Sequence, residues 1–389
     1  MKVLVLSFYY EPDLCAGSFR TTALIKALSK FSNIDIEVVS TLPNRYASFS
    51  ADAPAYQETA NLKVHRVKLP GHKSGMIDQA ISFITYYRAA MKIANKGDYD
   101  VVYATSSRLF TALLGARIAR KKKLPLYLDI RDIFVDTIGD VFSNKITWLL
   151  KPFFSCVERY AFSTATRINL VSEGFKGYFE SRYPKMTYRW FTNGIDDEFL
   201  NPLNMNHASK NESIKILYAG NIGEGQGLHE ILPKLSTALQ GKAEIIIVGD
   251  GGRKAILEER LLGSENVTFL PPVGRNELIE LYRNADVLFL HLNDYPAFEK
   301  VLPSKIFEYA ALGKPILAGV TGYAAKFLSE EVDNSATFYP GDSQGALNVL
   351  STLDMNDIDR SSFKTKFSRT AIMNNMATDI VEFVNNEGC

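Results

Sequence analysis

Cysteine and histidine are scarce in this chain, which has three cysteines and five histidines among 389 residues. Cys15, Cys156 and Cys389 form an odd, scattered set, which argues against a disulfide framework and against a zinc site. The histidines are also too dispersed to indicate a cluster of metal ligands. We therefore expect no metal and no bound cofactor, and a reducing cytoplasm as the compartment.

Long hydrophobic runs are absent as well. No stretch of the sequence reaches the roughly 18 apolar residues that are needed to span a bilayer. The first apolar run, Val3 to Tyr10, is interrupted by Glu11-Pro12 and lacks a small-residue cleavage site, so we do not expect a secretory signal. The sequence predicts a protein that is soluble or peripheral to a membrane.

A strong excess of one charge is missing overall, because 44 Lys and Arg residues balance 43 Asp and Glu residues. The two halves differ, however: residues 1–195 contain 27 basic and 16 acidic side chains, whereas residues 196–389 contain 17 and 27. A basic half suits nucleic acid, an anionic membrane surface or a phosphorylated acceptor. Alternatively, the two halves attract each other across a cleft.

Short apolar runs alternate along the chain with stretches of helical periodicity, which predicts parallel sheets covered by helices. The polar segment 204–213, NMNHASKNES, interrupts this pattern and predicts a linker. We therefore expect an α/β protein with two Rossmann-like, doubly wound domains, 1–200 and 201–369, facing a cleft. The helical segment 370–389 could pack back on the first domain.

The segment Pro303 to Leu317, PSKIFEYAALGKPIL, predicts a helix that Pro303-Ser304 opens and Gly313 closes, followed by an apolar strand. The start of a helix presents free N–H groups and the positive end of its dipole, which suit a phosphate. Glu308 on the same helix can accept from sugar hydroxyls, so the segment suits a nucleotide sugar. The alternative is an ordinary helix-strand unit in which Ser304 is the N-cap and Glu308 is solvated.

The order of motifs resembles that of the retaining GT-B glycosyltransferases of the family 4 type, which include bacterial polysaccharide and O-antigen sugar transferases. The resemblance covers nearly the full chain. It rests on six motifs, namely EPDLCAGS, FTNGIDDEF, YAGNIGEGQG, VGDGG, NADV and PSKIFEYAALGKPIL. It implies a GT-B fold, a nucleotide-sugar donor and no metal. The tripeptides 98–100 and 357–359 look like the DxD signature of metal-dependent enzymes, but we interpret both as false positives.

The resemblance also implies a donor site in the second half of the chain. In this family a Glu pair eight residues apart contacts the donor; Glu308 matches the second member, whereas Lys300 occupies the first position and could meet a phosphate or remain exposed. An Arg and a Lys five residues apart usually neutralise the leaving diphosphate, and here the corresponding positions are Asn221 and Gln226. The missing charge must then come from elsewhere. Lys305 is our first candidate, and Arg253 and Arg20 are further ones.

Backbone contacts complete the donor site that the resemblance implies. Gly251 would let the backbone approach the nucleotide, and Val273 and Gly274 would contact the base. Gly17, in the first strand-helix loop, would approach the donor phosphates or would be a simple turn glycine.

On the acceptor side, Asp132 follows a predicted strand and could orient or deprotonate an acceptor hydroxyl, or form a salt bridge within its loop. Two segments of the basic half, 116–123 and 145–162, combine aromatic, aliphatic and basic residues. Such a composition suits a surface that enters the headgroup region of an anionic membrane, but it also suits core helices with solvated lysines.

We interpret the sequence as that of a hexosyltransferase-type enzyme. It would move a sugar, such as an amino- or deoxyhexose, from a UDP-sugar to a lipid-linked saccharide in cell-surface polysaccharide synthesis. It would act at the cytoplasmic face of the membrane by a retaining mechanism, with no nucleic-acid partner. The alternatives are a UDP-N-acetylhexosamine 2-epimerase of the GT-B fold and an inactive scaffold that binds nucleotide sugars.

Overall fold

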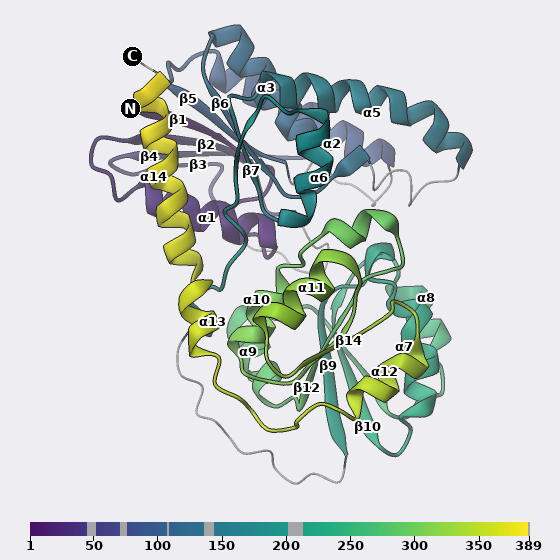
Figure 1. The fold of residues 1–389 in the computed structure, drawn as a ribbon. Coiled ribbons are helices and arrows are strands. Elements are labelled where there is room, and N and C mark those ends of the chain that lie inside the picture. Colours follow the sequence, from purple (N-terminus) through teal and green to yellow (C-terminus); the bar gives the residue numbers. More distant parts are fainter. Residues whose placement is uncertain (45–51, 71–75, 107–108, 136–143, 201–212, 388–389) are drawn as a thin grey trace. The chain divides into compact units, whose positions relative to one another are not determined.

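The structure is a computed structural model, and it describes residues 1–44, 52–70, 76–106, 109–135, 144–200 and 213–387. The contacts within it divide the chain into two compact units. Unit 1 consists of Met1–Asn193 and Arg369–Cys389, and unit 2 consists of Gly194–Ser368. Each unit is described by itself below (Figure 1).

Unit 1 is built on an eight-stranded sheet whose strands follow the order β3-β4-β2-β1-β5-β6-β7-β8. All neighbouring strands are parallel except β3 and β4. The central strands are apolar and buried because helices cover both faces of a parallel sheet. The strands are β1 Lys2–Leu6, β2 Asp35–Thr41, β3 Tyr56–Glu58, β4 Leu62–Val67, β5 Val101–Thr105, β6 Leu126–Ile130, β7 Arg167–Leu170 and β8 Thr187–Arg189.

The helices of unit 1 lie on the two faces of this sheet. Figure 1 shows α2, α3 and α5 over one face and α1 with α14 over the other. Gly115 of α3 lies so close to Ala104 of β5 that an added Cβ would stand 2.7 Å from the Ala104 Cβ, which explains a glycine inside this helix. The helices are α1 Ala16–Leu28, α2 Met76–Ala94, α3 Leu109–Lys122, α5 Asn144–Thr164, α6 Lys176–Arg182 and α14 Arg369–Glu387.

The last helix, α14, belongs to the contacts of unit 1 although it follows unit 2 in the sequence. Its apolar side chains share a core with those of β1, β2 and α1. Asp379 of α14 also accepts hydrogen bonds from Arg167 and Arg189, each at 2.7 Å, and from the Tyr127 hydroxyl at 3.0 Å. These contacts hold α14 on unit 1.

Unit 2 is built on a six-stranded parallel sheet with the order β11-β10-β9-β12-β13-β14. Along β9, Leu217 and Ala219 enter the core on one face, whereas Ile216 and Tyr218 enter the core on the other, as the alternation of a strand requires. The strands are β9 Ile214–Asn221, β10 Ala243–Asp250, β11 Val267–Leu270, β12 Val287–His291, β13 Ile316–Gly319 and β14 Ser335–Phe338.

Seven helices of unit 2 cover this sheet in the described part of the chain: α7 Leu228–Ala238, α8 Lys254–Arg260, α9 Arg275–Arg283, α10 Lys305–Ala311, α11 Gly322–Glu331, α12 Ser343–Leu350 and α13 Ser361–Lys366. Two parallel-dominated sheets with helices on their faces confirm the predicted doubly wound α/β class. The predicted linker lies almost entirely outside the described residues, as does the predicted boundary between residues 200 and 201.

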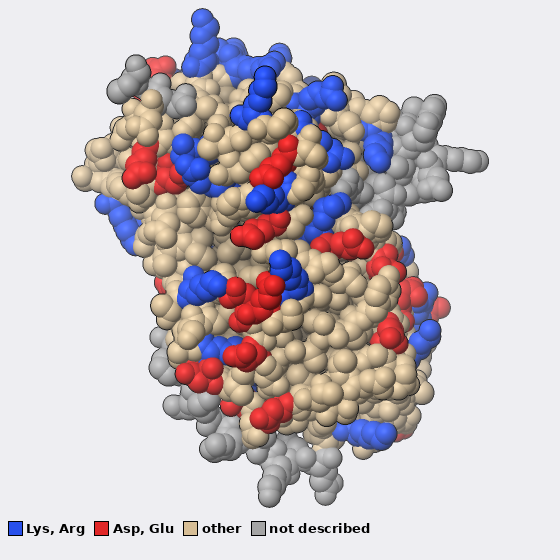
Figure 2. Space-filling view, viewed as in Figure 1, with Lys and Arg blue, Asp and Glu red and all other residues tan. Residues whose placement is uncertain are grey.

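Charge is distributed unevenly over the face that Figure 2 shows, with Lys and Arg frequent on unit 1 and Asp and Glu more frequent on unit 2. Within the described residues, no helix has the combination of length and hydropathy that crossing a bilayer requires.

Candidate functional site

The helix α10 carries three of the predicted site residues, and its sequence fixes its position at both ends. It begins at Lys305 after Pro303 and ends at Ala311, and Gly313 then takes a left-handed φ of 72°. The predicted helix and the strand after it, β13, are both present. Ser304 occupies the N-cap position, but its side chain makes no capping hydrogen bond. The Ser304 hydroxyl therefore has no structural role as a cap, which leaves it available to a ligand.

Arg360 fastens the other end of α10 to the body of unit 2. Its guanidinium donates to the carbonyl of Ala310 at 3.2 Å and to that of Lys314 at 3.1 Å. It also donates to the carbonyl of Asp333, and the whole residue is buried. These bonds satisfy a carbonyl at the end of the helix that would otherwise lack a partner. The helix that carries the candidate residues is therefore rigidly held.

Lys305 is a partly buried cation at the start of α10. Its Nζ lies 5.9 Å from the centroid of the Tyr218 ring, and its end packs on Gly220, where an added Cβ would stand 2.3 Å from Nζ. Burial lowers the pKa of Lys305 from its ordinary value, although the charge of Glu308 opposes this shift. In the described part of the chain, no carboxylate forms an ion pair with Lys305. An ammonium group in this position can bind an anion.

Glu308, one turn further along α10, is 8% exposed. Its Oε1 lies 3.5 Å from a guanidinium nitrogen of Arg275, the first residue of α9. Arg275 in turn pairs with Asp196 and lies over the ring of Phe199 at 4.9 Å. Among the described residues, no group hydrogen-bonds to the second carboxylate oxygen of Glu308. That oxygen remains able to accept from a hydroxyl of a ligand.

Arg275 is a basic residue of this site that the sequence did not suggest. Its pairing with Glu308 joins residues that are 33 positions apart, and no local pattern reveals such a contact. The only sequence signal was its place directly after Val273 and Gly274, both of which were predicted to contact the base. Gly274 is the N-cap residue of α9, and Val273 packs against a core of unit 2.

Asn221 and Gln226, which replace the expected basic pair, bind each other. The Asn221 amide donates to the Gln226 Oε1 at 2.8 Å, and the same oxygen accepts from the Gly223 N–H at 3.3 Å. The Tyr218 hydroxyl donates to the Asn221 carbonyl at 2.6 Å, which holds the end of β9. In this loop after β9, neutral hydrogen bonds therefore join Asn221 and Gln226.

His291 at the end of β12 hydrogen-bonds to the same loop, and no local sequence pattern indicated this contact. The Gly341 N–H donates to its Nε2 at 3.0 Å, so its proton lies on Nδ1, which donates to the Gln226 carbonyl at 2.7 Å. Burial lowers the pKa of His291 to about 4, and the Gln226 carbonyl only partly offsets this effect. His291 is therefore a neutral positioning residue at physiological pH.

The remaining predicted residues of unit 2 have other neighbours. Arg253 forms an ion pair with Glu224 and its side chain is 41% exposed. Lys300 ends a short 3-10 helix, Pro296–Lys300. Gly251 has a φ of 158°, and an added Cβ there would stand 2.5 Å from the carbonyl oxygen of Ile222. A glycine is thus required here because the backbone of residue 251 lies close to the loop after β9.

In unit 1, Arg20 is embedded in the protein, with 1% of its side chain exposed. It binds both carboxylate oxygens of Asp129, at 2.7 and 2.9 Å, and donates to the carbonyls of Phe191 and Thr192. The charge of Asp129 raises the pKa of Arg20 against the opposing effect of burial. With its donors directed at protein acceptors, Arg20 is a poor candidate for contact with a donor phosphate.

The other two predicted residues of unit 1 lie near the carboxyl ends of strands, where α/β sheets bind ligands. Gly17 lies in the first turn of α1, and its carbonyl accepts from the Thr21 hydroxyl at 2.9 Å. Asp132 follows β6 by two residues. Although the residue as a whole is exposed, nearby protein atoms displace water from its carboxylate and raise its pKa to about 6, and the charge of Arg131 opposes this shift.

Among the described residues, no group of three or more His, Cys, Asp or Glu side chains could together hold a metal ion. Metal independence stays a prediction. The cations that the structure brings near Glu308 are Lys305 and Arg275, both on unit 2. This arrangement, a buried carboxylate between two cations at the start of two helices, can bind a ligand that has phosphates and hydroxyls.

Residues 203–365 match the family model described as Glycosyl transferases group 1. A curated relative, the putative colanic acid biosynthesis glycosyl transferase WcaI of Escherichia coli (strain K12), is 36% identical over 100 residues. That match covers 25% of this chain and 24% of the relative, so it spans about a quarter of each protein.

Two similar solved structures cover nearly the whole chain. Sucrose-phosphate synthase from Thermosynechococcus elongatus has a TM-score of 0.76 at 13% identity, covering 99% of this chain and all of that one. Anabaena HepE in complex with UDP-glucose has a TM-score of 0.67 at 16% identity, covering 98% of this chain and 99% of that one. These similarities confirm the predicted GT-B type of fold. The family match and the relative also support the predicted enzyme class, a glycosyltransferase.

Proposed function

We propose that this chain is a glycosyltransferase that moves a sugar from a UDP-sugar to a lipid-linked saccharide in the synthesis of a cell-surface polysaccharide. The observation that carries the proposal is the presence on α10 of an ammonium group, Lys305, and a buried carboxylate, Glu308. Among the described residues, no carboxylate forms an ion pair with Lys305, and one oxygen of Glu308 has no hydrogen-bond partner. The family match over residues 203–365 and the curated relative support transfer chemistry. The HepE structure in complex with UDP-glucose supports a UDP-sugar as donor.

In the proposed reaction, Lys305 binds the diphosphate and the free oxygen of Glu308 accepts from the ribose. The bond between the anomeric carbon and the phosphate oxygen breaks, and the acceptor oxygen bonds to the same face of that carbon. The acceptor hydroxyl transfers its proton to the leaving phosphate, so configuration is retained without a protein nucleophile. The positive charge of Lys305 stabilises the negative charge that develops on the leaving oxygens. Asp132 of unit 1 is the proposed residue that orients the acceptor hydroxyl.

An anionic membrane surface is the second partner that we propose. The segments of α2, α3 and α5 contain nine Lys or Arg residues and only two carboxylates, Asp78 and Glu158. Phe153 on α5 is 55% exposed, and Ile81 and Ile84 on α2 are each 47% exposed. Basic residues around exposed apolar side chains favour contact with an anionic bilayer, where a lipid-linked acceptor would reside.

The test uses the full chain with a panel of UDP-sugars, first by thermal shift and then by transfer to lipid extracts. We expect one UDP-sugar to raise the melting temperature by mass action, and UDP release to require the lipid acceptor. Conversion of the sugar without any acceptor would instead indicate an epimerase. Binding with no transfer to any extract would indicate a scaffold, and the absence of any shift would refute donor binding.

Glu308→Ala is expected to weaken donor binding without unfolding the protein. Losing a hydrogen bond to a charged group costs about 1.5–3 kcal/mol, which corresponds to a roughly 10- to 100-fold higher Kd for the UDP-sugar. Titration calorimetry measures the Kd, and circular dichroism checks the fold. Glu330→Ala is the matched control, since it removes one carboxylate from an exposed position of the same unit. Equal affinities for Glu308→Ala and the control would contradict the role given to Glu308.

A further inference from the structure

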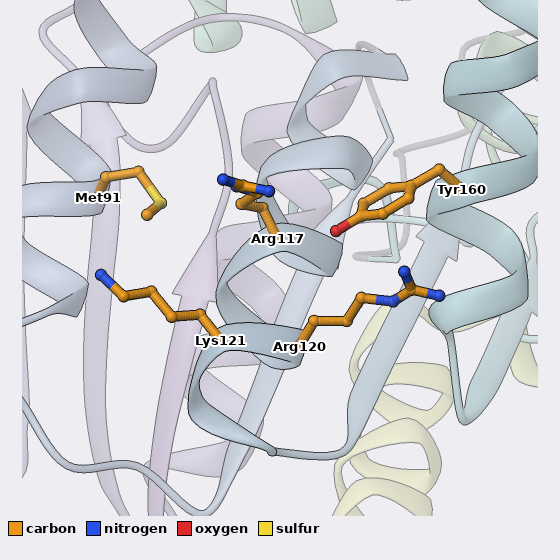
Figure 3. Close-up of a pocket in the computed structure, with 5 residues that line it drawn as sticks. All are labelled: Met91, Arg117, Arg120, Lys121 and Tyr160. Carbon is orange, nitrogen blue, oxygen red and sulfur yellow. The ribbon is translucent and has the colours of Figure 1, made fainter.

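A pocket of about 560 Å³ opens on unit 1, whereas α10 belongs to unit 2. Its lining residues are Met91 from α2, Arg117, Arg120 and Lys121 from α3, and Tyr160 from α5. In Figure 3 the three basic side chains extend from one helix, with Met91 to one side of them and Tyr160 to the other. Three cations therefore share a pocket whose remaining wall is a thioether and a phenol ring.

Topology places this pocket at the amino edge of the sheet. Each lining residue stands near the carboxyl end of its helix, and the chain then leads into the start of β5, β6 or β7, which are neighbours in the sheet. Ligands of open α/β sheets bind at the opposite edge, beyond the carboxyl ends of the strands. The pocket is thus separate from the edge of unit 1 where Asp132 lies.

Among the residues that the structure describes, the three cations have no carboxylate partner that would neutralise them. Arg117, Arg120 and Lys121 are three and four residues apart on α3, so like charges face each other at an unfavourable spacing. No carboxylate of the described chain forms an ion pair with any of them. Lys121 donates to the Asn95 Oδ1 at 2.9 Å, which uses one of its three donors and adds no negative charge.

The dipole of α3 explains the position of only some of these cations. Arg120 and Lys121 lie in the last turn of α3, where cations are favourable. Arg117 lies one turn earlier, where the dipole has little effect. The Arg120 guanidinium lies over the Tyr160 ring, with 4.6 Å between its central carbon and the ring centroid. Stacking on an aromatic face leaves the N–H groups at the edge of the guanidinium directed outward, ready for an oxyanion.

We propose that this pocket binds the phosphate group of a phosphorylated ligand, through Arg117, Arg120 and Lys121. Bidentate arginine pairs suit phosphate geometry, and a lysine adds a point charge. The volume exceeds what a bare phosphate fills, and it lies in the range of small-molecule sites. The uncharged part of the ligand packs against Met91 and Tyr160. Binding here does not depend on the proposed transfer reaction, because none of these residues belongs to the donor site.

The ligand can be a soluble phosphate compound or the headgroup of a phospholipid, and two probes separate these sources. Calorimetry with pyrophosphate measures soluble binding to the full chain. Co-sedimentation with phosphatidylglycerol vesicles, compared with phosphatidylcholine vesicles, measures headgroup binding. We expect saturable binding of at least one anionic probe by the wild-type protein. Saturation with pyrophosphate assigns a soluble ligand, and binding to phosphatidylglycerol vesicles alone assigns a headgroup.

Two triple variants decide whether the pocket itself is responsible. Arg117→Gln/Arg120→Gln/Lys121→Gln removes the pocket cations, and Lys26→Gln/Lys68→Gln/Lys185→Gln removes three exposed cations of the same unit that lie outside α2, α3 and α5 and do not line the pocket. The pocket variant should bind the anionic probe that the wild-type protein binds at least about tenfold more weakly. The affinity of the control variant for that probe should change by less than about twofold.

Equal weakening in both variants would show that diffuse surface charge attracts the probe, and would overturn the proposal. So would the absence of saturable binding of either anionic probe to the wild-type protein. Because the pocket cations are exposed, we expect both variants to fold. The single change Arg117→Gln tests the same proposal with less risk to the fold, because Arg117 makes no hydrogen bond or ion pair with the described residues. It should weaken binding of the anionic probe that the wild-type protein binds, whereas Lys26→Gln should not.

Discussion

Lys305→Ala is expected to lower kcat about 10²- to 10³-fold while leaving the fold intact. A positioned group that stabilises developing negative charge contributes an effect of this size, and Lys305 has no carboxylate partner of its own among the described residues. Asn221 and Gln226, which stand where the resemblance implies a basic pair, bind each other through a neutral hydrogen bond. They cannot supply the missing charge, so the effect should fall largely on Lys305. Steady-state kinetics with the UDP-sugar identified by thermal shift measures it.

The control for this prediction is Lys326→Ala, which removes the same charge from unit 2. Lys326 lies on α11 with 64% of its side chain exposed, and its ammonium group lies 3.9 Å from the carboxylate of Glu330, one turn away. Its kcat should remain within about twofold of the wild-type value, since exposed ion pairs contribute little. A kcat for Lys305→Ala that is equally close to the wild-type value would refute the role of Lys305 as the main cation. Arg275 would then be the next residue to replace.

The α10 segment shows what the sequence could predict. Its signals are local: a proline and a serine before the helix, a glycine after it, and an apolar run beyond that glycine. The structure has α10 and β13 where these signals place them, and Gly313 has the left-handed φ that a glycine permits. Alternation of strand and helix patterns likewise predicted both parallel sheets, because that pattern is repeated over many elements.

Contacts between distant residues could not be predicted in this way. Arg275 contacts Glu308 across 33 positions, and His291 fixes the carbonyl of Gln226 across 65. A single sequence contains no signal for either pair, because each depends on how strands and helices pack. The glycine motif after β10 illustrates the same limit. Gly251 was assigned to a nucleotide, whereas in the structure its missing Cβ makes room for the backbone of Ile222.

Arg20 is a further residue whose distant contact the sequence did not predict. Its replacement is the second variant for which we expect a large effect. Arg20 was a further candidate for the missing charge of the donor site, but Asp129, 109 residues later, is its partner, and both side chains are almost completely buried. Arg20→Met is expected to lower the free energy of unfolding of unit 1 by about 3–5 kcal/mol, because it leaves a buried carboxylate without its counter-charge. The carbonyls of Phe191 and Thr192 would also lose a donor. Urea denaturation followed by circular dichroism measures the change.

Two further variants separate a structural role of Arg20 from a ligand contact. Lys26→Met removes an exposed cation from the same helix, α1, and should leave the urea midpoint nearly unchanged. Arg20→Met/Asp129→Leu should recover a large part of the lost stability, because a buried ion pair can often be replaced by apolar side chains at little cost. If Arg20→Met instead kept its stability and lost UDP-sugar affinity, Arg20 would be a donor-binding residue after all. The buried pair predicts the reverse: folded Arg20→Met protein should bind the donor with wild-type affinity, because the polar contacts of Arg20 with the described residues are all with unit 1 itself.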